Sequence, residues 1–223
     1  MTPANHIPAG ILLSTAYLPP LEYMACLVRA KTARIELHET YPRQSWRNRC
    51  TLLTGNGPAA LIIPVNKPQG NHTKTKDVLI SDHMAWQRKH WQSIVSAYGN
   101  APYFFYYKDL LAPFYHSQPA QHLWKFNHAL LESIIGELQL ETAITFSLTY
   151  QHQPEGITDL RTTFTPKPHR KTTKIVNEWP FYQQVFADRY GFVTDPSIAD
   201  LLFNLGPEAK SYLESLKIKT WTG

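Results

Sequence analysis

The segment from Tyr41 to Cys50 concentrates side chains that could bind an anion. Two aromatic residues, three arginines and an asparagine occur in this short stretch: Tyr41, Trp46, Arg43, Arg47, Arg49 and Asn48. If the segment enters a strand, Arg47 and Arg49 share a face because alternate strand residues point the same way. A guanidinium binds phosphate or carboxylate through paired hydrogen bonds. We therefore expect both arginines to hold an anionic ligand; the alternative is one structural ion pair and one solvated arginine.

The polar and aromatic neighbours of these arginines are expected to orient the rest of the ligand. Tyr41 and Asn48 carry groups that can hydrogen-bond an acceptor substrate. Tyr17 and Trp46 can stack on a sugar or a base, because aromatic rings combine a large apolar face with a polar edge. The alternative is that these rings belong to a tyrosine-rich core, since the chain holds 12 Tyr and 6 Trp.

His90 is the expected acid–base residue. It follows Trp86 by one helical turn, and histidine is the usual proton-transfer group near neutral pH. The alternative is a hydrogen-bonded, half-buried histidine, one of 10 in the chain. Cys50 could act as a nucleophile only beside a base that supplies the thiolate. Cysteine is among the most frequently buried residues, so we expect Cys50 to be structural.

Several classes of protein are disfavoured by the absence of their motifs. We find no phosphate-binding glycine loop, no nucleophile elbow and no metal-binding spacing, so we expect neither a cofactor nor a metal. Only two cysteines occur, which does not make a disulfide framework. No apolar run is long enough to span a membrane and no secretory signal is visible, so we expect a cytoplasmic protein.

The net charge of +5 is unevenly distributed. Residues Leu160 to Val176 contain five lysines and arginines and no acid. Together with Pro and Gly nearby, this predicts a mobile basic loop over about 150–176. Clustered cations favour an anionic small molecule such as a sugar nucleotide. Nucleic acid is disfavoured because no recognition motif accompanies the charge; the oligomeric state stays open.

The elements that would position these residues begin with a β-loop-α-β unit. Gly10–Thr15 and Ala33–Leu37 read as strands, with a helix over Leu21–Lys31 between them. This spacing predicts neighbouring parallel strands. Because ligands of such sheets usually lie beyond the carboxyl ends of strands, Tyr17–Pro20 is expected at the edge of a cleft.

The remaining pattern predicts a hairpin and a series of helices. The hairpin joins Trp46–Leu53 to Ala59–Val65 through Asn56-Gly57. Further expected strands are Asp77–Ile80 and Thr142–Thr149, and expected helices are Met84–Ala97, Pro102–Leu111, Pro119–Leu138, Trp179–Tyr190, a helix capped by Ser197, and Glu208–Leu216. No linker divides the chain. We predict an α/β (mixed α+β) fold: a single domain over 1–223 with a mixed sheet flanked by helices.

In this order, the motifs resemble the WbqC-like protein family over about Ile11 to Gly206, most closely a Bacteroidetes-type branch. They are Tyr17-Leu18-Pro19-Pro20, Tyr41, Trp46-Arg47-Asn48-Arg49, Ile63-Pro64-Val65, Trp86, Lys89-His90, Ser93-Ile94, Ala101-Pro102-Tyr103-Phe104 and Pro196-Ser197-Ile198. The sequence departs from the family in having His38-Glu39-Thr40 where many members are more acidic, and Cys50 where many carry Asn. If those positions do chemistry, the activity here differs or is lost.

The resemblance implies a role in bacterial surface polysaccharides. Members commonly occur among genes for lipopolysaccharide O-antigen, and the resemblance implies attachment of an acyl or aminoacyl group to an amino sugar. The expected function is a transferase acting on a sugar nucleotide or surface-glycan precursor. The alternative is a non-catalytic binding or assembly protein of cell-envelope biogenesis.

Overall fold

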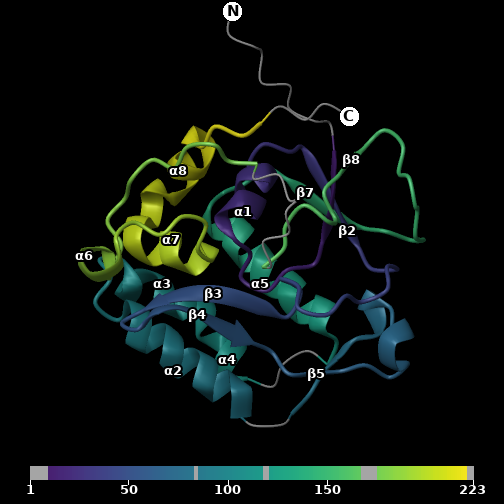
Figure 1. Cartoon of the computed structure of the whole chain (residues 1–223), viewed down its shortest axis with the longest axis horizontal. Coiled ribbons are helices and arrows are strands. Elements are labelled where there is room, and N and C mark those ends of the chain that lie inside the picture. The colour runs from purple at the N-terminus through teal and green to yellow at the C-terminus, as the bar shows by residue number, and fades with distance from the viewer. Residues whose placement is uncertain (1–9, 83–84, 118–120, 167–174, 220–223) are drawn as a thin grey trace, which may run out of the picture.

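The centre of the fold is a parallel sheet. The computed structural model describes residues 10–82, 85–117, 121–166 and 175–219. Its four-stranded sheet has the order β7-β2-β1-β8 (Figure 1). Strands β1 (Ile11–Ser14) and β2 (Thr32–Glu36) pair in parallel with Ile11 opposite Ala33, which confirms the expected β-loop-α-β unit. β7 (Ala143–Phe146) lies beside β2 and β8 (Thr158–Asp159) beside β1, both parallel.

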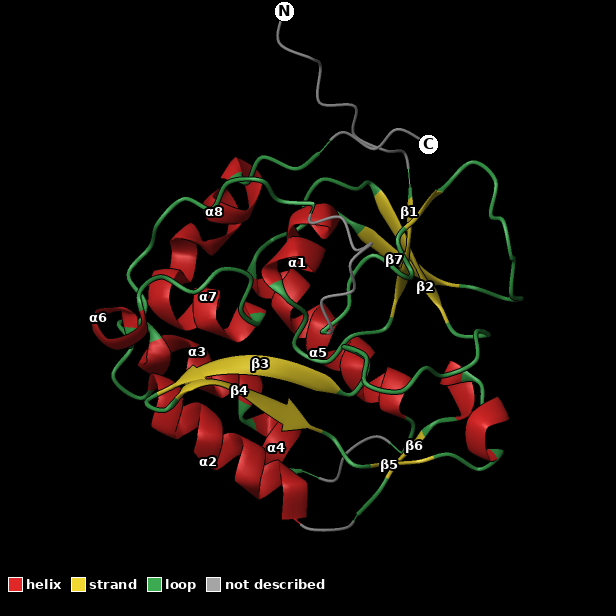
Figure 2. Ribbon diagram, viewed as in Figure 1, coloured by secondary structure: helices red, strands yellow, loops and turns green. Residues whose placement is uncertain are grey.

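The two faces of this sheet differ in what covers them. In β2, Ala33 and Ile35 are buried while Thr32 and Arg34 are exposed. The buried face packs against α1 (Leu21–Leu27) and α5 (Leu123–Glu137), as expected where alternate residues alternate in polarity. The opposite, outer face carries no helix in Figure 2, where helices lie on one side of β1, β2 and β7 and loops on the other.

The expected hairpin forms, but in a sheet of its own. β3 (Arg49–Thr54) and β4 (Gly57–Ile62) are antiparallel, with Thr54 opposite Gly57. Gly57 has φ +95°, a left-handed value that favours glycine at this tight turn. β5 (Val65–Asn66) and β6 (Leu79–Ile80) form a second small antiparallel pair. The α/β class is confirmed, but the expected single mixed sheet is replaced by separate parallel and antiparallel sheets.

Helices surround the hairpin and close the core. Their bounds are α2 (Trp86–Tyr98), α3 (Phe104–Leu111), α4 (Pro113–His116), α6 (Ala187–Tyr190), α7 (Ile198–Leu205) and α8 (Ala209–Ser215), with short 3-10 turns at Gly70–His72, Thr75–Asp77 and Gly206–Glu208. β3 contacts both α2 and α7. The Ser197 side chain accepts a hydrogen bond from the Ala199 N–H, which confirms it as the cap of α7.

One predicted helix is wrong. Trp179–Tyr190 was expected to be helical throughout, but only Ala187–Tyr190 is. Gln184 explains the extended conformation, because its amide exchanges hydrogen bonds with the Val193 backbone and donates to Asp200. These tertiary bonds outweigh local helix propensity.

The expected basic loop over 150–176 also contains ordered contacts. Thr158 and Asp159 form β8 and pair with β1. Arg161, expected in an exposed basic stretch, is buried and ion-paired. Part of the stretch, 167–174, lies outside the described residues, and the mobility of the loop stays a prediction.

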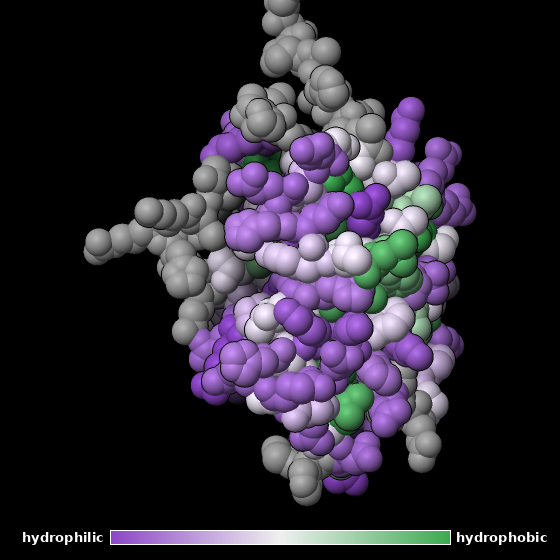
Figure 3. Space-filling view, turned by 90° about the vertical axis from the view of Figure 1, so that its right-hand side faces the viewer, coloured by the Kyte–Doolittle hydropathy of each residue, from purple (hydrophilic) through white to green (hydrophobic). Residues whose placement is uncertain are grey.

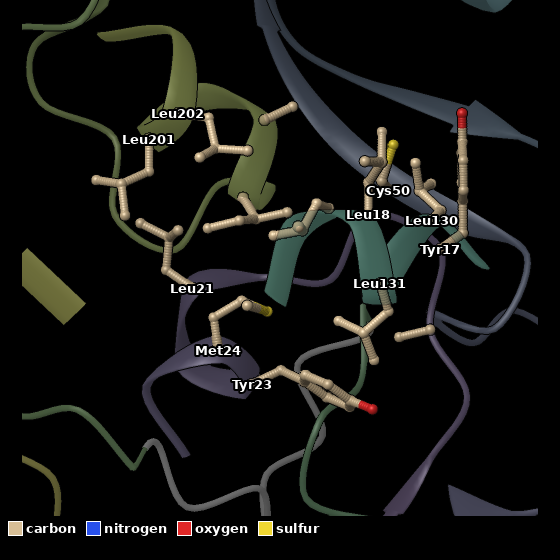
Figure 4. Close-up of a cluster of buried hydrophobic side chains, with 14 of the residues drawn as sticks. Tyr17, Leu18, Leu21, Tyr23, Met24, Cys50, Leu130, Leu131, Leu201 and Leu202 are labelled. Carbon is tan, nitrogen blue, oxygen red and sulfur yellow. The ribbon is translucent and has the colours of Figure 1, made fainter. Parts of the chain in front are cut away.

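One hydrophobic core connects the sheet, the hairpin and the helices. Figure 4 shows Leu21 and Met24 of α1 between Leu201 and Leu202 of α7 and the side chain of Tyr23. Gly206 is required at the end of α7: its φ is +54°, and a Cβ there would lie 2.5 Å from the Tyr103 ring. A substitution at Gly206 would therefore both strain the backbone and displace a core aromatic residue.

Candidate functional site

The arginine segment lies beyond the carboxyl ends of β1 and β2. Arg47 donates to Ser14, the last residue of β1, and to Glu39, which follows β2, with an Nη2–Oε1 distance of 2.6 Å. Arg47 is buried, so its charge needs these partners. Burial raises the pKa of Glu39, and the guanidinium of Arg47 opposes that rise. Arg47 therefore takes the structural ion-pair role that was the alternative to ligand binding.

A second ion pair extends this network along the edge of the sheet. Arg161 binds Asp159 at the end of β8 through two hydrogen bonds of 2.9 and 2.6 Å, and its Nη1 lies 3.4 Å from Glu36 at the end of β2. Burial raises the pKa of Asp159, but the hydrogen bonds from Arg161 outweigh this and lower it. The Ser14 hydroxyl joins the two halves, because it accepts from Arg47 and donates to the Arg161 carbonyl.

Sequence reasoning missed most of this network. Glu36, Asp159 and Ser14 were not singled out, and Arg161 was expected on the surface. Glu36 and Arg161 are 125 positions apart, so no local pattern connects them. One available signal was the position of Ser14 and Glu36 at the ends of predicted parallel strands, where ligand-binding residues usually gather.

Tyr41 and Arg49 carry buried polar atoms without partners among the described residues. They are the Tyr41 hydroxyl and the Arg49 Nε. Burial raises the pKa of Tyr41 to about 12, and the positive charges of Arg47 and Arg49 oppose the rise. Two donors left without an acceptor are costly when buried. Both groups therefore retain an unused capacity to donate a hydrogen bond.

Arg49 pairs with neither Glu39 nor Asp200. Glu39 binds Arg47 instead, and Asp200 accepts hydrogen bonds from Tyr182 and Gln184. Within the described part of the chain, no hydrogen bond or ion pair involves the Arg49 side chain. Arg47 is paired within the protein, so of the two arginines expected to bind an anion only Arg49 keeps that role as a prediction.

Two asparagines hold the backbone around the arginines. Asn48 Nδ2 donates to the Ile63 carbonyl at 2.8 Å, just after β4. Asn127 of α5 donates to the Arg47 carbonyl at 2.7 Å and to Thr15 Oγ1 at 3.1 Å. Its Oδ1 is buried and has no partner among the described residues. Asn48 is thereby committed to the hairpin, and Asn127 is a polar residue of the site that the sequence did not reveal.

His90 and Tyr17 lie together in the interior of the protein. The Tyr17 hydroxyl is 3.0 Å from His90 Nδ1 and 2.7 Å from the Tyr115 hydroxyl. The rings of Trp86 and Tyr17 pack against the His90 ring, with centroids 5.1 and 5.7 Å away. Burial lowers the pKa of His90 to about 4, so the ring is neutral at pH 7. Because Tyr17 engages Nδ1, an acid–base role at that nitrogen stays a prediction that requires this bond to open.

The predicted site residues differ in how deeply they are buried. Tyr17, Tyr41, Arg47, Asn48 and His90 are buried, whereas Trp46 and Arg49 are half-buried. The Trp46 carbonyl accepts the Tyr17 N–H at 2.9 Å. His90 thus fixes the side chain of Tyr17 through a hydrogen bond. The Tyr17 backbone in turn fixes the turn that contains Trp46, and the half-buried Trp46 and Arg49 lie closer to the surface.

Cys50 behaves as a core residue. It is 1% exposed, and burial raises the pKa of its thiol, which disfavours the reactive thiolate. Both cysteines are free.

The described residues offer neither a metal site nor a membrane-spanning helix. No group of three or more His, Cys, Asp or Glu side chains there has an arrangement that could hold a metal ion. Within the same ranges, no helix has both the length and the apolar character needed to cross a bilayer.

Comparisons with known proteins give one family and one relative. The model of the WbqC-like protein family matches residues 15–167, a range that includes the arginine segment and His90. The chain is 28% identical over 196 residues to Uncharacterized protein Rv1507c of Mycobacterium tuberculosis, covering 78% of this chain and 83% of that protein. No solved structure matches.

Proposed function

This chain belongs to the WbqC-like protein family, and we propose that it is an acyl or aminoacyl transferase acting on a sugar nucleotide or surface-glycan precursor. The observation that carries the ligand site is the pair of buried, unpartnered donors on Tyr41 and Arg49. A phosphate or carboxylate accepting from both would satisfy them and neutralise Arg49. Their position beyond the carboxyl ends of parallel strands is where open α/β sheets usually bind ligands.

The residues of the arginine segment take separate roles in this proposal. Arg49 and Tyr41 bind the anionic group, and Trp46 packs against the sugar or base. Arg47 and Asn48 are positioning residues, because their side chains already donate hydrogen bonds within the protein. Arg47 donates to Ser14 and Glu39, and Asn48 donates to the Ile63 carbonyl.

His90 also enters as a positioning residue, since it anchors Tyr17 and, through the Tyr17 N–H, the Trp46 turn. It becomes the acid–base residue only if ligand binding frees a ring nitrogen.

A second candidate, a non-catalytic binding or assembly protein of the cell envelope, is favoured by one observation. The Asn48 side chain donates to the Ile63 carbonyl and His90 Nδ1 bonds to the Tyr17 hydroxyl, so both side chains have partners within the protein. Such a protein would still bind the anion at Arg49 but would lack a group that moves a proton.

A mass-spectrometric transfer assay separates the two candidates. The protein is incubated with acyl or aminoacyl donors and amino-sugar nucleotides, and the acceptor is examined for the added acyl mass. Transfer that Arg49→Gln abolishes while the fold is retained supports the transferase. Ligand binding without transfer by any donor supports the non-catalytic candidate.

A further inference from the structure

A pocket of about 350 Å³ opens on the outer face of the parallel sheet, away from the unpartnered donors of Tyr41 and Arg49. Its floor includes Leu12, Arg34 and Thr145, which are register neighbours across β1, β2 and β7. Its wall is the segment 147–151, which follows β7. This face lies on the side of the molecule seen in Figure 3, where the surface is mainly hydrophilic with small hydrophobic areas. The volume is in the range of small-molecule sites.

Arg34 supplies a positive charge that none of the described residues neutralises. It is exposed and forms no hydrogen bond or ion pair with any residue in the described ranges. Glu36, two residues further along the same face, is the nearest carboxylate in the strand. Its oxygens already accept from the Ser147 hydroxyl, the His38 N–H and Arg161. The pocket therefore presents a free guanidinium beside a carboxylate that is occupied.

The other lining groups suit a ligand with hydroxyl groups and an apolar side. Thr145, Thr149 and Gln151 are exposed and offer donors and acceptors. Leu12, Phe146 and Leu148 supply apolar surface. Leu148 is 88% exposed, which is unusual for a leucine. Its side chain is therefore available to contact a ligand in the pocket.

We propose that this pocket binds a small anionic ligand bearing hydroxyl groups, with its phosphate or carboxylate on Arg34. Arg34 binds the anion as a fork, while Thr145, Thr149 and Gln151 bind hydroxyls. The pocket is joined to the carboxyl-edge network through Glu36 and Arg161. The proposal does not depend on the transferase, because a non-catalytic protein could use the same pocket.

The test is titration calorimetry of the full chain with glucose 6-phosphate, glucuronate, inorganic phosphate and uncharged glucose. Glucose 6-phosphate and glucuronate show whether the pocket prefers a phosphate or a carboxylate. Inorganic phosphate and glucose show how much the anion and the hydroxyl groups each contribute to binding. Three proteins are compared: the parent, Arg34→Gln and Arg88→Gln. Arg88 is the matched control, because it is an exposed arginine of α2, distant from the sheet in Figure 1. Arg34 has no protein partner among the described residues, so Arg34→Gln is expected to melt at the parent temperature.

The expected result is that one of the two sugar anions binds the parent more tightly than phosphate or glucose does. Arg34→Gln weakens that binding at least about tenfold, the loss of one charge-assisted contact, and Arg88→Gln leaves it unchanged. The proposal is overturned if neither sugar anion binds, if Arg34→Gln binds as the parent does, or if both arginine variants weaken binding equally. Arg49→Gln distinguishes this pocket from the site of the proposed function, because the variant should bind the sugar anion in the Arg34 pocket as tightly as the parent does.

Discussion

The Tyr17 hydroxyl lies 3.0 Å from Nδ1 of His90, although 73 positions separate the two residues in sequence. The contact joins the loop after β1 to α2 and is completed by the Tyr115 hydroxyl. It ties the central sheet to the helices beneath the hairpin. Because all three groups are buried, they form a closed polar cluster whose parts depend on one another.

Removing the Tyr17 hydroxyl should destabilise the protein. Tyr17→Phe leaves His90 Nδ1 and the Tyr115 hydroxyl buried without this partner, which costs about 1–3 kcal/mol. Urea denaturation measures the loss in free energy of unfolding. Tyr106→Phe is the control, since Tyr106 is 79% exposed, and it should have no effect. Equal stability of Tyr17→Phe and the parent would show that the hydrogen bond contributes nothing.

His90 should remain neutral well below the ordinary pKa of histidine. Burial lowers its folded pKa to about 4 from 6.5. The unfolded state therefore binds the proton first, so the stability that His90 contributes is present above about pH 6.5 and is lost as the pH falls through about 4. NMR titration of ¹³C-labelled histidine, assigned by His90→Gln, gives the midpoint directly. A midpoint near 6.5 would contradict the burial of the His90 ring in the folded protein.

Asp200 should produce the opposite pH dependence. Burial raises its pKa to about 6, despite hydrogen bonds from Tyr182 and Gln184 that favour the charged form. The folded state then binds the proton more tightly than the unfolded state does. The contribution is greatest below about pH 3.8 and is lost as the pH rises through about 6.

The comparison that isolates this effect is the parent against Asp200→Asn, which cannot titrate. Between pH 4 and 7 the parent should lose about 2–3 kcal/mol of unfolding free energy relative to the variant. Parallel stability curves over that interval would exclude a raised pKa at Asp200.

Cys50 should resist alkylation in the folded protein. It is 1% exposed and its thiol has a raised pKa, so iodoacetamide at pH 8 should label it only after unfolding. Mass spectrometry after a timed reaction, with and without urea, follows the modification. Rapid stoichiometric labelling without urea would reveal an accessible thiolate and reopen a nucleophilic role.

Local signals predicted the parts of the fold that depend on neighbouring residues. The β1–α1–β2 unit, the turn at Gly57 and the cap at Ser197 follow from spacing and residue type. β8 was missed because two residues form it only by pairing with a distant strand. The helix expected over Trp179–Tyr190 was wrong because the bonds of Gln184 are tertiary.

The sequence predicted where the candidate site lies better than it predicted which of its side chains are paired. The arginine segment and Tyr17 do lie beyond the carboxyl ends of β1 and β2. The sequence could not predict which arginine lacks an ion-pair partner among the described residues, because this depends on the pairing of Glu39 with Arg47 in the folded protein. Strand alternation also failed at this point, since β3 begins at Arg49 and Arg47 lies in the preceding turn.

The central claim is that Arg49 and Tyr41 bind an anionic ligand, and thermal-shift measurements with Arg49→Gln test it most directly. The parent and the variant are screened against sugar nucleotides at low salt, with Arg88→Gln as the matched control. We predict that the unliganded variant melts with the parent, because Arg49 has no described partner to lose. A sugar nucleotide should raise the melting temperature of the parent and of Arg88→Gln but not of Arg49→Gln. If Arg49→Gln unfolds and no sugar nucleotide stabilises the parent, Arg49 is structural and the proposed ligand site is wrong.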